Sequence, residues 1–126
     1  MNAPLASTAR LHPELLLQIL DVPLSFHRCL VPISGSVTAA LLLSQAICNA
    51  QGADPALDGW FSKSQDEWGE ETGLTRWEQA TARRLLREAG FLEEQRLGMP
   101  AKLWFRVRPE RVWQALQERA GALAPR

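Results

Sequence analysis

The sequence predicts a mainly α-helical protein that carries a small β-hairpin, which places it in the α+β class. Two segments, 64–67 and 75–78, have the S/T-x-x-E pattern of a capping box, whose side chains satisfy free backbone donors at a helix start. Gly73 lies between them and suits the left-handed conformation that ends a helix. Apolar and polar residues alternate over 103–107, as in a half-buried strand. Two helices joined by a glycine turn and followed by a hairpin predict a winged helix-turn-helix.

One helix is predicted ahead of the main part of the domain. Residues 1–11 mix Ala, Pro, Ser and Thr without periodicity, so we expect a flexible tail. Pro13 suits the first turn of a helix, and apolar residues recur at helical spacing as far as Leu20. This helix either packs onto the domain or serves dimerisation. Residues 26–31 are expected to form a short strand or an extended linker, which Pro32 ends.

The helix predicted over 37–50 is apolar around most of its circumference, which is typical of a helix at the centre of a domain. A loop follows over 51–59, where acidic residues, Gly and Pro gather. Residues 60–61 are expected to form a very short strand. The next helix begins at the first capping box and is acidic in its first turn, which suits the helix dipole.

The helix predicted over 75–89 has two different faces. Ala82, Leu86 and other apolar residues recur at helical spacing on one side, and most of the arginines lie on the other. Gly90 ends the helix. Strands are then predicted over 91–97 and 103–107.

Pro109 begins a last helix. At 126 residues the chain is expected to form one domain, over 12–118, with a second flexible tail over 119–126.

Charge is balanced overall but separated along the chain. The net charge is zero, which does not favour DNA binding, since many DNA-binding domains are strongly basic. Residues 54–73, however, hold six acidic residues and one lysine, whereas residues 76–108 hold eight basic residues and four acidic ones. Such a separation gives one surface an attractive field for phosphate even when the sum is zero.

The remaining features argue against several other classes. The two cysteines match no metal-ligand spacing, and the N-terminal region lacks the order of a signal peptide. The longest apolar stretch is too short to cross a bilayer, so we expect a cytoplasmic protein with no membrane partner. His12 and His27 have no nucleophile at a motif spacing, and there is no glycine-rich phosphate loop. We therefore expect no enzyme activity, cofactor or metal.

The candidate nucleic-acid-binding residues lie on the helix at 75–89 and on the wing at 92–107. The helix would enter the major groove of double-stranded DNA, and the tip of the wing would meet the minor groove or the backbone. The alternative for the arginines is a solvated face, paired with Glu88 or with the acidic helix. The candidate residues are Arg76, Trp77, Arg83, Arg84, Arg87, Arg96 and Lys102.

The tryptophans and Gln79 carry separate expectations. Trp68 and Trp113 lie at amphipathic positions and are expected in the core, as structural residues. Trp104 is either exposed or covered by a terminal helix, and an exposed pair with Trp77 would indicate a protein interface. Gln79 lies near the buried border and is expected to support packing.

The segment 60–107 resembles a family of small winged-helix proteins of phages, plasmids and other mobile elements, many of them replication-related. The resemblance is carried by Thr72-Gly73-Leu74-Thr75-Arg76, by Gly90-Phe91-Leu92-Glu93-Glu94, and by Gly98-x-Pro100-Ala101-Lys102-Leu103-x-Phe105-Arg106-Val107. It covers roughly residues 31–116, and the acidic second helix departs from the pattern. The resemblance implies a DNA-binding protein that acts in transcription regulation or DNA replication.

Two functions therefore stand against each other. The first is a DNA-binding protein of a mobile element. Its N-terminal helix could join two copies as a homodimer. The alternative is a winged-helix adaptor that binds a protein of the replication or transcription machinery instead of DNA.

Overall fold

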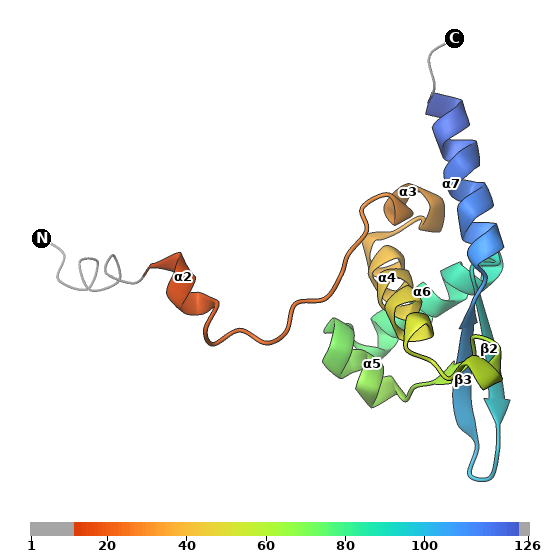
Figure 1. The fold of residues 1–126 in the computed structure, drawn as a ribbon, viewed down its shortest axis with the longest axis horizontal. Helices are drawn as coiled ribbons and strands as arrows, with labels where there is room; N and C mark the ends of the chain where they lie inside the picture. Colours follow the sequence, from red (N-terminus) through yellow and green to blue (C-terminus); the bar gives the residue numbers. More distant parts are fainter. Residues whose placement is uncertain (1–11, 124–126) are drawn as a thin grey trace, which may run out of the picture.

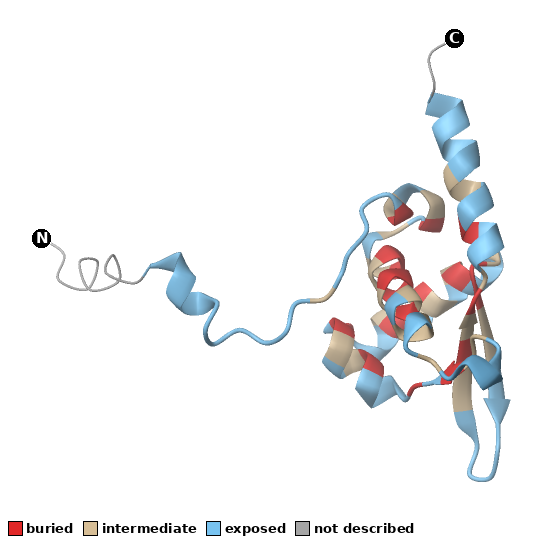
Figure 2. Cartoon of the chain, in the orientation of Figure 1, coloured by how far each residue is buried: buried red, intermediate tan, exposed pale blue. Residues whose placement is uncertain are grey.

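The computed structural model describes residues 12–123, and its core is built around helix α4 (Val37–Gln51). Ser36 caps the helix by accepting a hydrogen bond from the backbone N–H of Ala39 at 3.0 Å. Buried residues lie on several sides of α4, including Ala39, Leu42, Leu43 and Ala46, none of which is exposed. Figure 2 shows these buried positions concentrated in α4 and in the elements around it. The prediction of a central helix is confirmed.

Helices α5 (Gln65–Thr72) and α6 (Arg76–Ala89) follow one another across a tight turn. Both predicted capping boxes are present, with Ser64 and Thr75 as the capping residues. Gly73 ends α5 at a φ of 76°, a left-handed conformation that glycine adopts without a steric penalty. The turn therefore sets α6 at an angle to α5, while α6 packs against α4.

The sheet has three antiparallel strands in the order β1-β3-β2. Strand β1 (Phe61–Ser62) pairs with β3 (Lys102–Val107), and β3 forms a hairpin with β2 (Leu92–Leu97). Phe105 on β3 lies opposite Phe61 and is fully buried. Its ring meets that of Trp68 from α5 edge-on, with centroids 5.4 Å apart, so this aromatic contact joins the sheet to the helices.

The α+β class is confirmed among the described residues, which form six α-helices, a short 3₁₀ helix (Pro55–Leu57) and this small sheet. None of the described helices combines the length and the apolar character needed to span a bilayer.

The N-terminal region differs from the prediction. The expected helix from Pro13 to Leu20 is shortened to α2 (Pro13–Leu16), and residues 12–20 are all exposed. This segment does not pack onto the domain but extends away from it (Figure 1). Since α2 buries no residue against the domain, it lacks the packing that stabilises most helices, and isolated short helices are marginal in water.

Two further differences concern the region before α4 and the C-terminal end. Residues 26–29 form neither helix nor strand, as the linker alternative expects, but a one-turn helix, α3 (Leu30–Ser34), begins before the expected end of this segment, and Pro32 is tolerated in its first turn. Helix α7 (Pro109–Leu123) continues through 119–123, so this stretch is helical and not an irregular tail. No proline interrupts this helix after Pro109, and its single glycine, Gly121, disfavours the helix by only about 1 kcal/mol. The tails expected at 1–11 and 124–126 lie outside the described residues.

Candidate nucleic-acid interface

The outward face of α6 carries four of the predicted residues. Arg76, Trp77, Arg84 and Arg87 are all exposed, and the Trp77 side chain is 76% exposed. The opposite side of α6 is sealed into the core by Ala82 and Leu86. This two-faced helix follows directly from the 3.6-residue period of its sequence.

Each arginine of the exposed face has a carboxylate of the same chain beside it. Arg76 lies 3.2 Å from Asp66 of α5, and Arg84 lies 3.3 Å from Glu88 one turn along α6. These are the pairs that the alternative interpretation, a solvated face, predicts. Arg87 lies 2.7 Å from Glu94 on β2. In all three pairs the guanidinium side chain remains at least 41% exposed.

Arg83 differs from its neighbours, because its side chain is only 14% exposed. It lies 2.9 Å from the same Glu94 oxygen that Arg87 contacts, and its guanidinium lies over the ring of Phe105 at 6.0 Å. Its Nε and Nη1 atoms are buried without a well-oriented hydrogen-bond partner. The sequence placed Arg83 on the flank of the exposed face, but in the structure it joins α6 to the sheet.

The hairpin presents two cations that are less constrained. Arg96 on β2 and Lys102 on β3 are exposed, and neither forms an ion pair with any other described residue. The turn between the strands exposes Met99 almost completely. Arg106, further back on β3, is instead occupied by Glu93 and Asp58 and stacks on the ring of Trp60 at 4.9 Å.

Helix α5 brings an acidic surface to one side of this face. Asp66, Glu67 and Glu70 are exposed on it. The pKa of Glu67 lies below its usual value, first because of the hydrogen bond from the backbone N–H of Ser64 and then because of the Ser64 side chain. The lowered pKa keeps the Glu67 carboxylate ionised at neutral pH, and the acidic surface of α5 would repel phosphate close to it.

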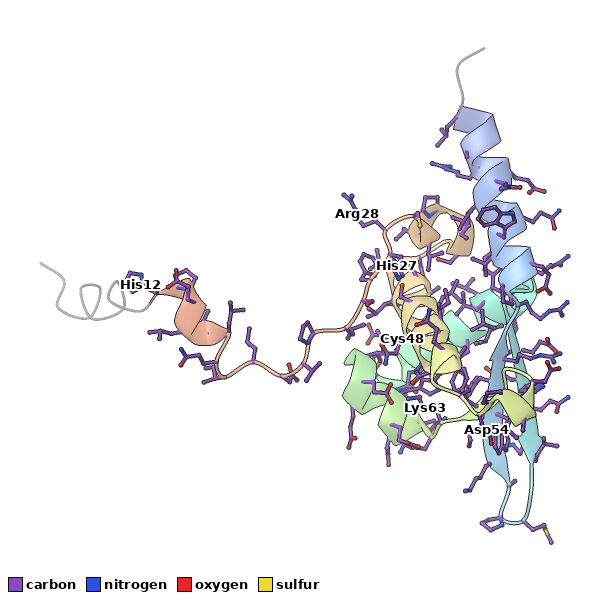
Figure 3. All side chains as sticks on the ribbon, viewed as in Figure 1. His12, His27, Arg28, Cys48, Asp54 and Lys63 are labelled. Atoms are coloured by element: carbon purple, nitrogen blue, oxygen red, sulfur yellow. The ribbon has the colours of Figure 1, made fainter. Side chains whose placement is uncertain are left out.

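A buried polar cluster lies between α4 and α5, and sequence reasoning did not find it. Lys63 is 7% exposed, and its ammonium group contacts Glu71 and lies 3.3 Å from Asn49 Oδ1 (Figure 3). Glu71 also accepts a hydrogen bond of 2.7 Å from Gln45. Burial raises the pKa of Glu71, but the hydrogen bonds from Lys63, Gln45 and Asn49 outweigh it and hold this pKa below its usual value. The one sequence signal for this cluster is Lys63, the single basic residue among the acidic residues of 54–73.

Of the expectations for the tryptophans and Gln79, some are confirmed and one is wrong. Trp68 is fully buried as expected, and Gln79 is buried and donates to the carbonyl oxygens of Gln65 and Leu74 at 3.1 Å. The packing role of Gln79 is confirmed. The expectation for Trp113 is wrong, since its side chain is 64% exposed on α7. Trp104 is half-buried.

The two histidines are far apart. Figure 3 shows His12 at the start of α2, outside the body of the protein, and His27 near α4, where its backbone N–H donates to Ser44 Oγ. Within residues 12–123, no group of three or more His, Cys, Asp or Glu side chains is arranged to hold a metal ion.

Comparison of the chain with protein-family models, with curated proteins and with solved structures gives no match. The function must therefore be argued from the geometry of the chain itself.

Proposed function

We propose that this chain is a winged-helix protein that binds double-stranded DNA, with α6 as the recognition helix and the β2–β3 hairpin as the wing. The observation that carries the proposal is the exposed face of α6 with Arg76, Arg84 and Arg87, flanked by a hairpin with two cations that form no ion pair with described residues. The helix order and the strand order β1-β3-β2 support the fold assignment. A role in transcription regulation or in replication of a mobile element agrees with the sequence resemblance described above.

The ion pairs of α6 are weak enough to be exchanged for phosphate. Exposed pairs of this kind contribute about 0–1 kcal/mol each, because water screens the charges and the side chains lose freedom. The pairs of Arg76 and Arg84 are of this kind, since both partners are more than half exposed. A phosphate offers the same charge-assisted hydrogen bonds, so an approaching duplex can replace Asp66 and Glu88 as partners.

The dimensions suit a duplex. A major groove about 12 Å wide admits one α-helix, and α6 has an exposed polar face that can enter it. Arg76 lies in the first turn and Arg84 and Arg87 lie two to three turns further on, so the three cations can follow the groove and its flanking phosphates. Arg96 and Lys102 extend the positive surface along the hairpin. We leave Arg83 out of the binding face because Glu94 and Phe105 cover it.

A salt titration tests the proposal. The double variant Arg84→Ala with Arg87→Ala should bind a duplex about 10–100-fold more weakly at low salt, and the slope of log affinity against log salt should decrease by about 1.8, which corresponds to two lost phosphate contacts. The matched control is Arg28→Ala with Arg119→Ala, which removes the same charge from exposed positions away from α6. Equal losses in both double variants, or no loss in either, would contradict the proposed face.

The adaptor is the second candidate, and the acidic surface of α5 next to the exposed Trp77 favours it. An exposed tryptophan beside charged residues is a common anchor of protein interfaces. If the chain is an adaptor, the wild type should capture a stoichiometric protein partner and retain no duplex at low salt. Trp77→Ala would then abolish the capture of the partner. Trp77→Ala in a DNA-binding protein would leave the salt slope unchanged, because an indole neutralises no phosphate.

A further inference from the structure

The segment of residues 12–26, here called the arm, exposes an unusual amount of apolar surface. Seven large apolar side chains on it are exposed: Leu15, Leu16, Leu17, Ile19, Leu20, Val22 and Phe26. They form half of the fourteen large apolar side chains exposed in residues 12–123. A contiguous apolar surface of this kind marks an interaction site in a soluble protein.

The arm is also close to a helix without completing one. Beyond α2 the backbone continues in helical turns, since the N–H groups of Leu17, Gln18 and Ile19 bond to carbonyl oxygens three residues back and that of Leu20 to the one four residues back. Leu15, Leu16, Ile19 and Leu20 lie on one side at this spacing. Most helical stability in proteins comes from packing of such a face, and the apolar side chains of the arm stay exposed among the residues that the structure describes.

A matching hollow lies on the body of the protein, between the C-terminal part of α4 and the first turns of α7. Its volume is about 860 Å³, and its apolar lining includes Ile47 and Ala50 from α4 and Val112, Trp113 and Leu116 from α7. Trp113 is 64% exposed at its edge, although tryptophan is among the side chains that gain most from burial. A hollow of this size accommodates several leucine-sized side chains.

We propose that the arm of a second copy of this chain, through residues 13–22, occupies this hollow, so that two copies exchange arms across a two-fold axis. The arm joins the body at α3, and α3 packs against α7, the helix that forms one wall of the hollow. The root of the arm therefore lies near one wall of the hollow, and residues 21–27, which form neither helix nor strand, give the arm the reach to enter the hollow of a facing copy. Such an exchange is isologous: the same arm and hollow contact occurs twice, and the assembly closes as a dimer.

A second copy fits better than the chain's own arm, because the arm extends away from its own body (Figure 1). The N–H of His27 donates to Ser44 Oγ of α4 at 3.1 Å, which fixes the root of the arm. On docking, the helix is expected to extend from Leu16 to Leu20, completing the turns already present. The inference does not depend on DNA binding.

Sedimentation velocity of the full chain over a wide concentration range tests the exchange. We expect a dimer for the wild type. The arm variant Leu16→Asp with Ile19→Asp and the hollow variant Trp113→Asp should each dimerise at least tenfold more weakly. The control Val37→Asp with Met99→Asp places the same charges at exposed apolar positions elsewhere and should dimerise like the wild type.

Mixing the arm variant with the hollow variant gives a sharper result. The first retains an intact hollow and the second an intact arm, so a heterodimer with one correct contact should form although neither variant pairs with itself. Absence of this complementation, a monomeric wild type, or a dimer that survives the arm substitutions would each overturn the proposal.

Energy transfer between two fluorescent dyes distinguishes arms exchanged between two copies from an arm that folds back onto its own body. Cys48 is exposed on α4 (Figure 3), next in sequence to Ile47 of the hollow, and it can carry one dye in a Cys29→Ser background. The other dye is placed on the arm at Val22→Cys in a chain with both native cysteines replaced by Ser. Transfer between the two singly labelled populations supports the exchange. Transfer only within a doubly labelled chain, independent of concentration, would mean that the arm covers its own hollow, and this would overturn it.

Discussion

At the scale of single residues, Glu71 holds α4 and α5 together, because it is the carboxylate partner of the buried Lys63. Glu71→Ala would leave this ammonium group buried with Asn49 alone and should lower the free energy of unfolding by about 1–3 kcal/mol. The pKa of Glu71 is lower in the folded state, so its stabilising contribution is present at neutral pH and is lost as the pH falls below 4.5. The difference between wild type and variant should therefore be largest at pH 7 and shrink on acidification, as measured by urea unfolding.

The control for this prediction is Glu70→Ala, one residue earlier on α5. Glu70 is exposed and forms no ion pair within the described part of the chain, so its removal should change the free energy of unfolding by less than about 0.5 kcal/mol at any pH. A pH-independent difference for Glu71→Ala would mean that the carboxylate charge is not what stabilises the contact.

The second prediction for a single residue concerns the largely buried guanidinium of Arg83. Its guanidinium is buried with two nitrogens that lack hydrogen-bond partners, and Glu94 keeps Arg87 as a partner when Arg83 is removed. Removing one partner of a buried ion pair is costly when it leaves an unpaired charge, but here Arg87 still pairs with Glu94, and an apolar side chain of similar volume avoids burying a guanidinium. Arg83→Met should therefore keep or raise the unfolding midpoint and leave duplex affinity within about twofold of the wild type. A large loss of affinity without loss of stability would return Arg83 to the binding face.

At the scale of elements, the position of α5 beside α6 makes the charge of α5 a regulator of the α6 face. Asp66→Asn removes one negative charge and releases Arg76, which lies 3.2 Å from it. We expect duplex affinity to rise several-fold at low salt and the salt slope to become steeper by up to about 0.9, the value for one added phosphate contact. Glu118→Gln on α7 makes the same charge change away from this face and serves as the control. Weaker binding by Asp66→Asn would argue that the duplex does not approach α6.

The elements that could be predicted from the sequence are those with local signals. The capping boxes at Ser64 and Thr75, the glycine at position 73 and the strand alternation before Val107 depend only on neighbouring residues, so α5, α6 and the hairpin appear where they were expected. The same holds for the outward direction of Arg84 and Arg87, which follows from helical periodicity.

The features that could not be predicted depend on contacts between distant segments. Burial of Arg83 is decided by β3, which places Phe105 under its guanidinium, and the exposure of Trp113 is decided by the distance of α7 from α4. The cluster of Lys63 with Glu71 is completed by Gln45 and Asn49 of α4, which are far from them in the sequence. No periodicity within one element contains this information, because a helical wheel shows which side a residue faces but not what lies there.

At the scale of the whole molecule, the chain consists of a packed body and two projections. Figure 1 shows the arm leaving the body on one side and α7 rising from the end of β3. The net charge of zero adds no general repulsion between copies. Association between copies would therefore depend on exposed apolar surface, and the arm and the edge of α7 carry much of it.

The body should be stable without the arm, which gives the last prediction. Between residues 12 and 22 every side chain is exposed, so deletion of residues 1–22 removes no core contact of the described arm residues and should change the unfolding free energy of dilute protein by less than about 0.5 kcal/mol. The proposed association would stabilise the wild type by mass action, so its thermal midpoint should rise with protein concentration, whereas that of the deletion variant should stay constant. Calorimetry at several concentrations measures both effects. A midpoint that depends on concentration equally in both proteins would place the dimer contact on the body alone, because the deletion leaves the α7 surface and its exposed Trp113 intact.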